Sequence, residues 1–275
     1  MDEKDRSMPQ SIILALDTST QACSVAINNA QGKVFHKDVM TPQSHANQIL
    51  DMIQTLMSDA EVKPNELDIL AYGQGPGAFT GIRIAAGVIQ GLALGWDKPV
   101  IGLSSLSSIA KSIIQLNIQK FQNYERVEWI SLVDARMKEV YWQAGIHLKN
   151  DWQESEIEML PAGEFLRRLE AKVKAFHQNS LTTSTDKKAL VICGDIEREY
   201  PQAIEMLAAY TGQNSDISWF PSLPSAQAML ELARLKQGEV QTTCEALPTP
   251  LYLRNHVADT IAEREAKKLA KSNLS

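Results

Sequence analysis

Short runs of apolar residues, some continuous and some alternating with polar residues, predict β-strands along the whole chain. The first three runs cover residues 12–16, 22–27 and 33–40, and segments of turn composition separate them. Further strands are predicted at 68–72, 100–103, 128–133, 139–146 and 189–193, with an extended segment at 247–253. The chain is therefore expected to open with a meander of strands.

Apolar residues that recur every three or four positions predict helices between these strands. In the segment 44–58 they start at Ala46 and recur at offsets of three, four, seven, ten and eleven, which defines one helical face with Ser44 as N-cap. Helices are also predicted at 104–116, 161–176, 201–210 and 225–236. The Ser/Thr-rich segment 178–188 is predicted to be a surface loop.

A further helix, at about 82–95, is apolar on two faces. One face carries Ile82, Ala85, Ala86, Ile89, Leu92 and Ala93, and the other carries Ile84, Gly87, Val88, Gly91, Leu94 and Gly95. Glycine inside a helix costs roughly 1 kcal/mol relative to alanine, so three glycines at a spacing of four need a physical reason. In membrane helix pairs such spacing lets a second helix approach closely. By analogy, we predict that another helix packs on the glycine face.

Strands and helices alternate in both halves of the chain, which predicts an α/β fold made of a duplicated unit. We expect an N-terminal domain at 8–104 that contains the partner-binding helices, and a C-terminal domain at 105–257. The helix near 225–237 is expected to pack back on the first domain. Residues 1–10 are predicted to be a flexible leader and residues 258–275 a charged tail.

Composition and charge narrow the class of protein. The 275 residues are 44% hydrophobic and 22% charged, which is ordinary for a globular protein. No charge-free run reaches the roughly 20 apolar residues of a membrane-spanning helix, and no secretory signal is predicted. Three widely separated cysteines, Cys23, Cys193 and Cys244, are expected to be reduced thiols of a cytoplasmic protein. A net charge of −6 without a basic stripe counts against nucleic-acid binding by this chain alone.

Two loops contain the candidate chemistry. The polar turn after a strand at Asp17 and Thr18 carries a carboxylate and a hydroxyl, side-chain groups that can bind a metal or a phosphate. The same residues also close β-turns through side-chain to backbone hydrogen bonds, and we favour this interpretation for the tetrapeptide 17–20. The loop 73–81, with Gly75, Gly77 and Thr80, enters a helix N-terminus, where free N–H groups suit anions.

The glycine loop matches neither the dinucleotide fingerprint nor the P-loop, so a role in shaping the connection is favoured over ligand binding. Arg83, in the first turn of the following helix, is a candidate to pair with a carboxylate of a partner or of the core. No Gly-x-Ser-x-Gly elbow is present, which argues against a serine hydrolase of that type.

His45, at the start of a predicted helix, is the one residue that suggests a metal. A helix-borne metal site needs a second ligand one turn later, and Ile49 occupies that position. None of the other histidines lies at helical spacing to His45. The residues alone therefore predict neither a metal site nor independent catalysis.

Five sequence blocks, in order, resemble the TsaB (YeaZ) family. They are ILALDTS at 13–19, GPGAFTGIR at 75–83, GLSSL at 102–106, DAR at 134–136 with EVY at 139–141, and PLYLR at 250–254. The resemblance extends from about residue 12 to residue 257. Ala78 replaces a serine or similar residue that is frequent in the glycine loop, and the segment 194–196 replaces a more glycine-rich turn. The second departure weakens the case for a nucleotide site in the second half.

The resemblance implies the duplicated fold of the actin-like and sugar-kinase superfamily. It also implies a non-catalytic subunit that supports TsaD, the metal-holding subunit that transfers threonylcarbamoyl to the adenosine beside the tRNA anticodon, in tRNAs that read codons beginning with A. Family members bind TsaD through a helix-to-helix interface, self-associate, and work with the ATPase TsaE. The implied partners are thus TsaD, TsaE and a second copy of the chain, with tRNA contacted only through the complex and no membrane contact.

The same resemblance assigns the candidate residues. The predicted partner-binding residues lie on two helices and are His45, Ile49, Ile53, Ile84, Gly87, Val88 and Gly91. The candidates for nucleotide or loop contacts are Asp17, Thr18, Gly75, Gly77, Thr80 and Arg83. No cofactor, metal ligand or catalytic residue is assigned, although a nucleotide at the partner interface stays open.

Two alternatives stay open from the sequence. In the first alternative, the chain is an active enzyme of the same superfamily. This enzyme is either an ATP-dependent phosphotransferase or a metallopeptidase of the related glycoprotease lineage. The missing second histidine and the ordinary turn at Gly194 count against it. In the second, the chain is a direct tRNA-binding module, against which the acidic balance counts.

Overall fold

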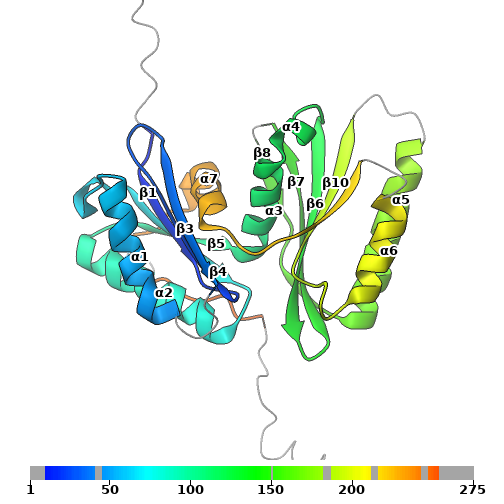
Figure 1. Ribbon diagram of the computed structural model, residues 1–275, viewed down its shortest axis with the longest axis horizontal. Coiled ribbons are helices and arrows are strands. Elements are labelled where there is room, and N and C mark those ends of the chain that lie inside the picture. The colour runs from blue at the N-terminus through cyan, green and yellow to red at the C-terminus, as the bar shows by residue number, and fades with distance from the viewer. Residues whose placement is uncertain are drawn as a thin grey trace, which may run out of the picture.

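The computed structural model describes residues 10–40, 45–149, 151–181, 187–211, 216–242 and 247–253, and of residues 45, 180 and 181 it describes the backbone alone. Most of the predicted leader, the predicted tail at 258–275, Ser44, Cys244 and the side chain of His45 lie outside the described residues. Two β-sheets stand beside each other, each covered on its outer side by helices (Figure 1).

The first sheet is formed by the N-terminal half of the chain. Its strands are β1 (Ile13–Asp17), β2 (Ala22–Asn28), β3 (Val34–Met40), β4 (Ile69–Gly75) and β5 (Val100–Ser104), in the order β3-β2-β1-β4-β5. The first three strands pair antiparallel, and β4 and β5 follow β1 in parallel. Strand β1 is buried on both faces, which explains its continuous apolar run.

The second sheet repeats this topology. Its strands are β6 (Arg126–Arg136), β7 (Glu139–Leu148), β8 (Asp151–Glu154), β10 (Lys188–Gly194) and β11 (Ile217–Pro221), in the order β8-β7-β6-β10-β11, while β9 (Glu158–Pro161) pairs with β7. Two antiparallel pairs are again followed by two parallel ones. The predicted duplicated α/β unit is confirmed. Strands β8, β9 and β11 were not predicted; β8 and β9 are only four residues long and each contains an acidic residue, so they lack an apolar run.

The helices form three layers around the two sheets. Helices α1 (His45–Asp59) and α2 (Phe79–Trp96) cover the outer face of the first sheet, and α5 (Ala162–Leu181) and α6 (Pro201–Thr211) cover that of the second. Helices α3 (Ser105–Leu116) and α7 (Ala226–Leu235) lie between the sheets, and α4 (Ile118–Phe121) is a single turn after α3. Helix α5 includes residues 178–181, so the predicted loop at 178–188 starts too early; no glycine or proline stops the helix there.

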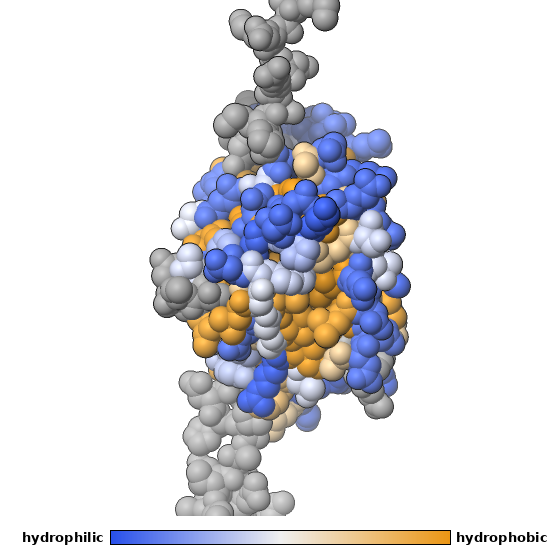
Figure 2. Space-filling view, turned by 90° about the vertical axis from the view of Figure 1, so that its left-hand side faces the viewer, coloured by the Kyte–Doolittle hydropathy of each residue, from blue (hydrophilic) through white to orange (hydrophobic). Residues whose placement is uncertain are grey.

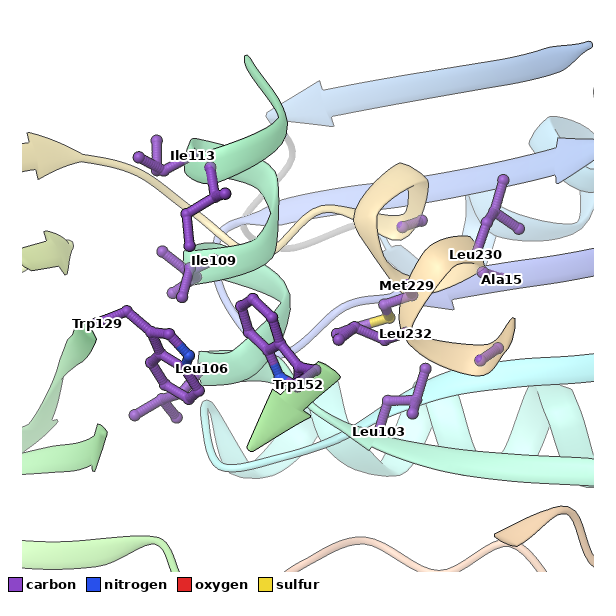
Figure 3. Close-up of a cluster of buried hydrophobic side chains, with 14 of the residues drawn as sticks. Ala15, Leu103, Leu106, Ile109, Ile113, Trp129, Trp152, Met229, Leu230 and Leu232 are labelled. Atoms are coloured by element: carbon purple, nitrogen blue, oxygen red, sulfur yellow. The ribbon is translucent and has the colours of Figure 1, made fainter. Parts of the chain in front are cut away.

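One apolar core is shared by both halves of the chain. It contains Ile13 and Ala15 of the first sheet, Trp129 of the second, and the inner faces of α3 and α7 (Figure 3). The rings of Trp129 and Trp152 stack within it, with centroids 5.1 Å apart. Helix α7 comes late in the sequence but packs on β1 and β2, and the N–H of Ala226 donates to the Ser24 hydroxyl at 2.8 Å.

Helix α2 combines length with an apolar composition. By these two criteria alone it is the one helix in the described ranges that could cross a membrane. A third of it is buried within the protein, because Ala85, Ile89 and Ala93 pack in the core on the outer side of the first sheet. The helix is thus part of the folded domain along one face.

The shared core predicts that both halves unfold together. Met229→Ala removes a fully buried side chain on α7, and we expect the free energy of unfolding to fall by ~2–5 kcal/mol. The measurement is urea unfolding followed by tryptophan fluorescence and circular dichroism. Met40→Ala is the matched control, because Met40 is 58% exposed on an edge strand, and its effect should stay within about 0.5 kcal/mol. Two separate transitions in the parent protein would contradict the shared core.

Candidate functional site

The carboxylate of Asp17 accepts hydrogen bonds from other groups of this chain. It is buried at the end of β1, and its Oδ1 accepts hydrogen bonds from the N–H and the hydroxyl of Ser19, both at 2.7 Å. Its Oδ2 accepts from the hydroxyl of Ser105, at the start of α3, at 2.7 Å. Asp17 therefore closes its own turn, as predicted, and also ties the first sheet to the helix between the sheets.

The loop after β1 fits against the glycine loop. The buried hydroxyl of Thr18 donates to the carbonyl of Gly81 at 2.7 Å, and the N–H of Ala78 donates to the carbonyl of Ser19 at 2.6 Å. A Cβ at Gly81 would overlap the carbonyl oxygen of Thr18, and one at Gly77 would overlap that of Ser19. These glycines allow two backbones to touch, which agrees with loop shaping. Gly75 is buried at the end of β4 beside Ser104 of β5.

Helix α2 has one buried and one open face. The first predicted face, with Ile82, Ala85, Ala86, Ile89 and Ala93, is buried. On the second, Gly87 and Gly91 are exposed and Ile84 and Val88 are half-buried. An added Cβ at Gly87, Gly91 or Gly95 would meet nothing within 4 Å, and Leu94 is 59% exposed. The predicted glycine face thus lies open along the helix, and Thr80 is exposed at its start.

The prediction for α1 needs a correction. Ile49 and Ile53 were predicted to bind a partner, but both are buried in the chain's own core, where α1 packs on β2 and β3. A helix with one apolar stripe has none left for a partner once the sheet covers that stripe. The large apolar residue of α1 that is exposed is Leu50. Figure 2 shows hydrophobic residues gathered on the side of the molecule where α1 and α2 lie.

Arg83 lies at the N-terminal end of the open face of α2. Its guanidinium carbon is 3.5 Å from the centre of the Phe79 ring, and its Nε donates to the hydroxyl of Tyr252 at 2.7 Å. Within the part of the chain that the structure describes, no carboxylate forms an ion pair with Arg83. Of the two candidate pairings, the one with a carboxylate of the core is therefore not found, and the one with a partner stays a prediction. The aromatic partner Tyr252 was not predicted, because 169 residues separate it from Arg83.

A cleft of about 490 Å³ opens between the two halves, beside Arg83's aromatic neighbours. It is lined by the segments 19–21, 77–79, 133–136, 195, 198–199 and 251–253, together with Ile82 and Tyr141. The N–H of Asp134 donates to the carboxylate of Asp195 at 3.2 Å, and Arg136 pairs with Asp134 at 3.3 Å. The sequence blocks around 17, 134 and 194 were each noted separately, and only the folded chain brings them to one cleft.

Asp195 is the most perturbed carboxyl group of the cleft. Burial raises its pKa from 3.8 to about 6, and the charge of Asp134 adds to the rise, whereas the hydrogen bond from Asp134 N–H and the charge of Arg136 oppose it. Nowhere in the described ranges do three or more His, Cys, Asp or Glu side chains gather closely enough to hold a metal.

Two sheets of identical topology, joined by a shared core and separated by a cleft, define an α/β protein of the actin-like and sugar-kinase class. The family model of TsaD, tRNA N6-adenosine threonylcarbamoyltransferase, matches residues 39–261. The chain is 33% identical to the tRNA threonylcarbamoyladenosine biosynthesis protein TsaB of Haemophilus influenzae over 249 residues, which are 89% of this chain and 94% of the relative. The TsaB of Escherichia coli is also 33% identical, over 90% of this chain and 96% of its own.

A solved structure agrees with these relatives. YeaZ from Pseudomonas aeruginosa superposes with a TM-score of 0.66 at 30% identity, over 89% of this chain and all of that chain. The chain belongs to the TsaB (YeaZ) family.

Gly81 and Gly87 lie on the same helix and predict opposite effects on stability. Gly81→Ala forces a Cβ onto the carbonyl of Thr18, so we expect the free energy of unfolding to fall by ~1–3 kcal/mol or more. Gly87→Ala places its methyl group in open space. This substitution should raise the free energy of unfolding by up to ~1 kcal/mol, because alanine favours the helix. Urea unfolding of both variants checks this. Similar effects of the two substitutions would contradict the packing described for α2.

The raised pKa of Asp195 predicts that the free energy of unfolding falls as the pH rises. Its pKa is higher in the folded chain, about 6 against 3.8, so the folded chain binds the proton more tightly. The protonated group stabilises the folded chain fully below about pH 4, and this stabilisation is lost as the pH rises to about 6. For a difference of two pKa units, the free energy of unfolding falls by up to ~3 kcal/mol over this range. Asp195→Asn keeps an acceptor for Asp134 N–H and should lack this decline. Parallel pH profiles of the two proteins in urea unfolding would refute it.

Proposed function

We propose that this chain is a non-catalytic subunit of the machinery that makes threonylcarbamoyladenosine in tRNA, and that it binds and supports a catalytic TsaD subunit. The open glycine face of α2 carries this proposal. The names of the TsaB relatives support the pathway. The match to the TsaD family model supports a partner of related fold, because two related chains can present similar helices to each other.

The open face of α2 has the properties that a helix-to-helix contact requires. Gly87, Gly91 and Gly95 leave a stripe of the helix without side chains, and we call this stripe the groove. Ile84, Val88 and Leu94 flank the groove with apolar surface that is partly open to solvent. A partner helix lying along the groove would remove this surface from water and make close backbone contact. His45, on α1, remains a proposed contact.

The hydrogen bonds of the loop after β1 agree with a supporting role without catalysis. In this chain the carboxylate of Asp17 is taken up by Ser19 and Ser105, and the hydroxyl of Thr18 by Gly81. Groups engaged in this way are not arranged to hold a metal or a phosphate. We further propose that the chain works in the cytoplasm with a TsaE ATPase, forms a homodimer, and meets tRNA only through the complex.

The cleft supports a second candidate function, an active enzyme of the same superfamily. It lies between two lobes, has a volume of about 490 Å³ and contains the perturbed carboxyl group of Asp195. One similar solved structure, from Pseudomonas aeruginosa, is titled as resembling a peptidase, and it is 29% identical with a TM-score of 0.63. Metal-dependent peptide cleavage or ATP hydrolysis by the purified chain would favour this alternative over the proposed role.

Gly87→Leu is expected to abolish binding to purified TsaD, because a leucine side chain fills the groove that the partner helix enters. The chain should stay folded, since the new side chain points into open space. Binding is measured by calorimetric titration, and tRNA modification by the reconstituted complex is followed in parallel.

Gly163→Leu is the matched control. Gly163 also lies on a helix with open space around its Cβ, but α5 covers the opposite side of the molecule (Figure 1). Binding should be unchanged in this variant. If Gly87→Leu binds TsaD as well as the parent chain does, α2 is not the docking helix and the proposal fails.

A further inference from the structure

A cation lies against two neighbouring aromatic rings where the open face of α2 begins. The guanidinium of Arg83 lies 3.5 Å from the Phe79 ring centre and 5.5 Å from that of Tyr252, and the two rings are 5.8 Å apart. Both rings stay at the surface, Phe79 with 46% and Tyr252 with 43% of its area exposed. We call these three residues the arginine cluster.

Tyr252 reaches this place through the extended segment 247–253, which lies against the first sheet. The Tyr72 hydroxyl accepts from the N–H of Thr249 at 2.9 Å and donates to its carbonyl at 3.1 Å. The N–H of Leu251 donates to the carbonyl of Gln74 at 2.7 Å. These bonds fasten the segment to β4, so the position of the Tyr252 hydroxyl, and with it that of the guanidinium, is set by the fold.

Among the residues that the structure describes, the Arg83 guanidinium keeps donors for an outside acceptor. Arginine has five N–H donors, and the hydrogen bond to Tyr252 uses the one on Nε. Arg168, by contrast, forms both an ion pair and a hydrogen bond with Glu158. Stacking on Phe79 fixes the plane of the Arg83 group and shields one side of it from water. A fixed planar fork of this kind suits the two oxygens of a carboxylate.

We infer that the docking face extends from the α2 groove onto the arginine cluster, and that Arg83 receives an Asp or Glu side chain of the partner subunit. This inference rests on the proposed function. Gly87 lies one turn from Arg83 on the same face, so one partner helix can cover both. An RNA phosphate fits less well, because the apolar groove adjoins the cluster and the chain carries a net charge of −6. Arginine and exposed aromatic residues are also enriched at protein interfaces.

The test is the affinity for purified TsaD at low and high ionic strength. Arg83→Gln should weaken binding roughly tenfold or more at low salt, and this difference should shrink as salt screens the pair. Tyr252→Phe keeps the ring and removes the acceptor of Nε, so a smaller loss is expected. Arg83→Lys keeps the charge without the fork and should fall between Arg83→Gln and the parent chain. Thermal melting of each variant verifies that it is folded.

Arg167→Gln is the matched control, because the exposed Arg167 on α5 also donates its Nε to a protein oxygen, that of Gly163 at 3.1 Å. Its affinity should equal that of the parent chain. Unchanged binding by Arg83→Gln, while Gly87→Leu abolishes binding, would overturn this inference and leave the proposed function intact. A loss that is the same at every salt concentration would also overturn it. So would normal TsaD binding with weaker retention of tRNA by the assembled complex, which would assign the guanidinium to a phosphate.

Discussion

The close contact between the loop after β1 and the first turn of α2 determines which side of α2 faces outward. The hydroxyl of Thr18 bonds to the carbonyl of Gly81, and only a residue without a Cβ lets these two backbones meet. Once Gly81 lies against this loop, the residues one and two turns later, among them Ala85 and Ile89, face the sheet. The glycines at 87 and 91 then point to solvent. The proposed docking face is thus a consequence of packing at the other side of the helix.

A second consequence concerns the relation between the two halves. Asp17 bonds to Ser105 at the start of α3, and α3 lies in the core that the two sheets share. Helix α7 adds to this core from the far end of the sequence, and the segment after it returns to β4. The cleft therefore lies between lobes that are joined by a large apolar contact. This shared apolar core favours one fixed arrangement of the two lobes.

The polar groups of the chain are divided between two tasks. In the loop after β1, Asp17 and Thr18 hold the fold together, because they bond to Ser105 and Gly81 of other elements. Those of the arginine cluster remain at the surface beside the groove. Helix α2 takes part in both arrangements, because its first turn contacts the loop while the rest of its open face lies at the surface.

The sequence by itself determined the α/β class, the duplicated unit and most helices and strands, because apolar periodicity reports directly on which face of an element is buried. It also marked the glycine face of α2, since glycine inside a helix is costly without a reason. Tertiary structure alone decided that Ile49 and Ile53 lie in the core and that Tyr252 joins Arg83. The reason is that one apolar stripe looks the same whether a sheet or a partner covers it, and contacts between distant segments leave no local pattern.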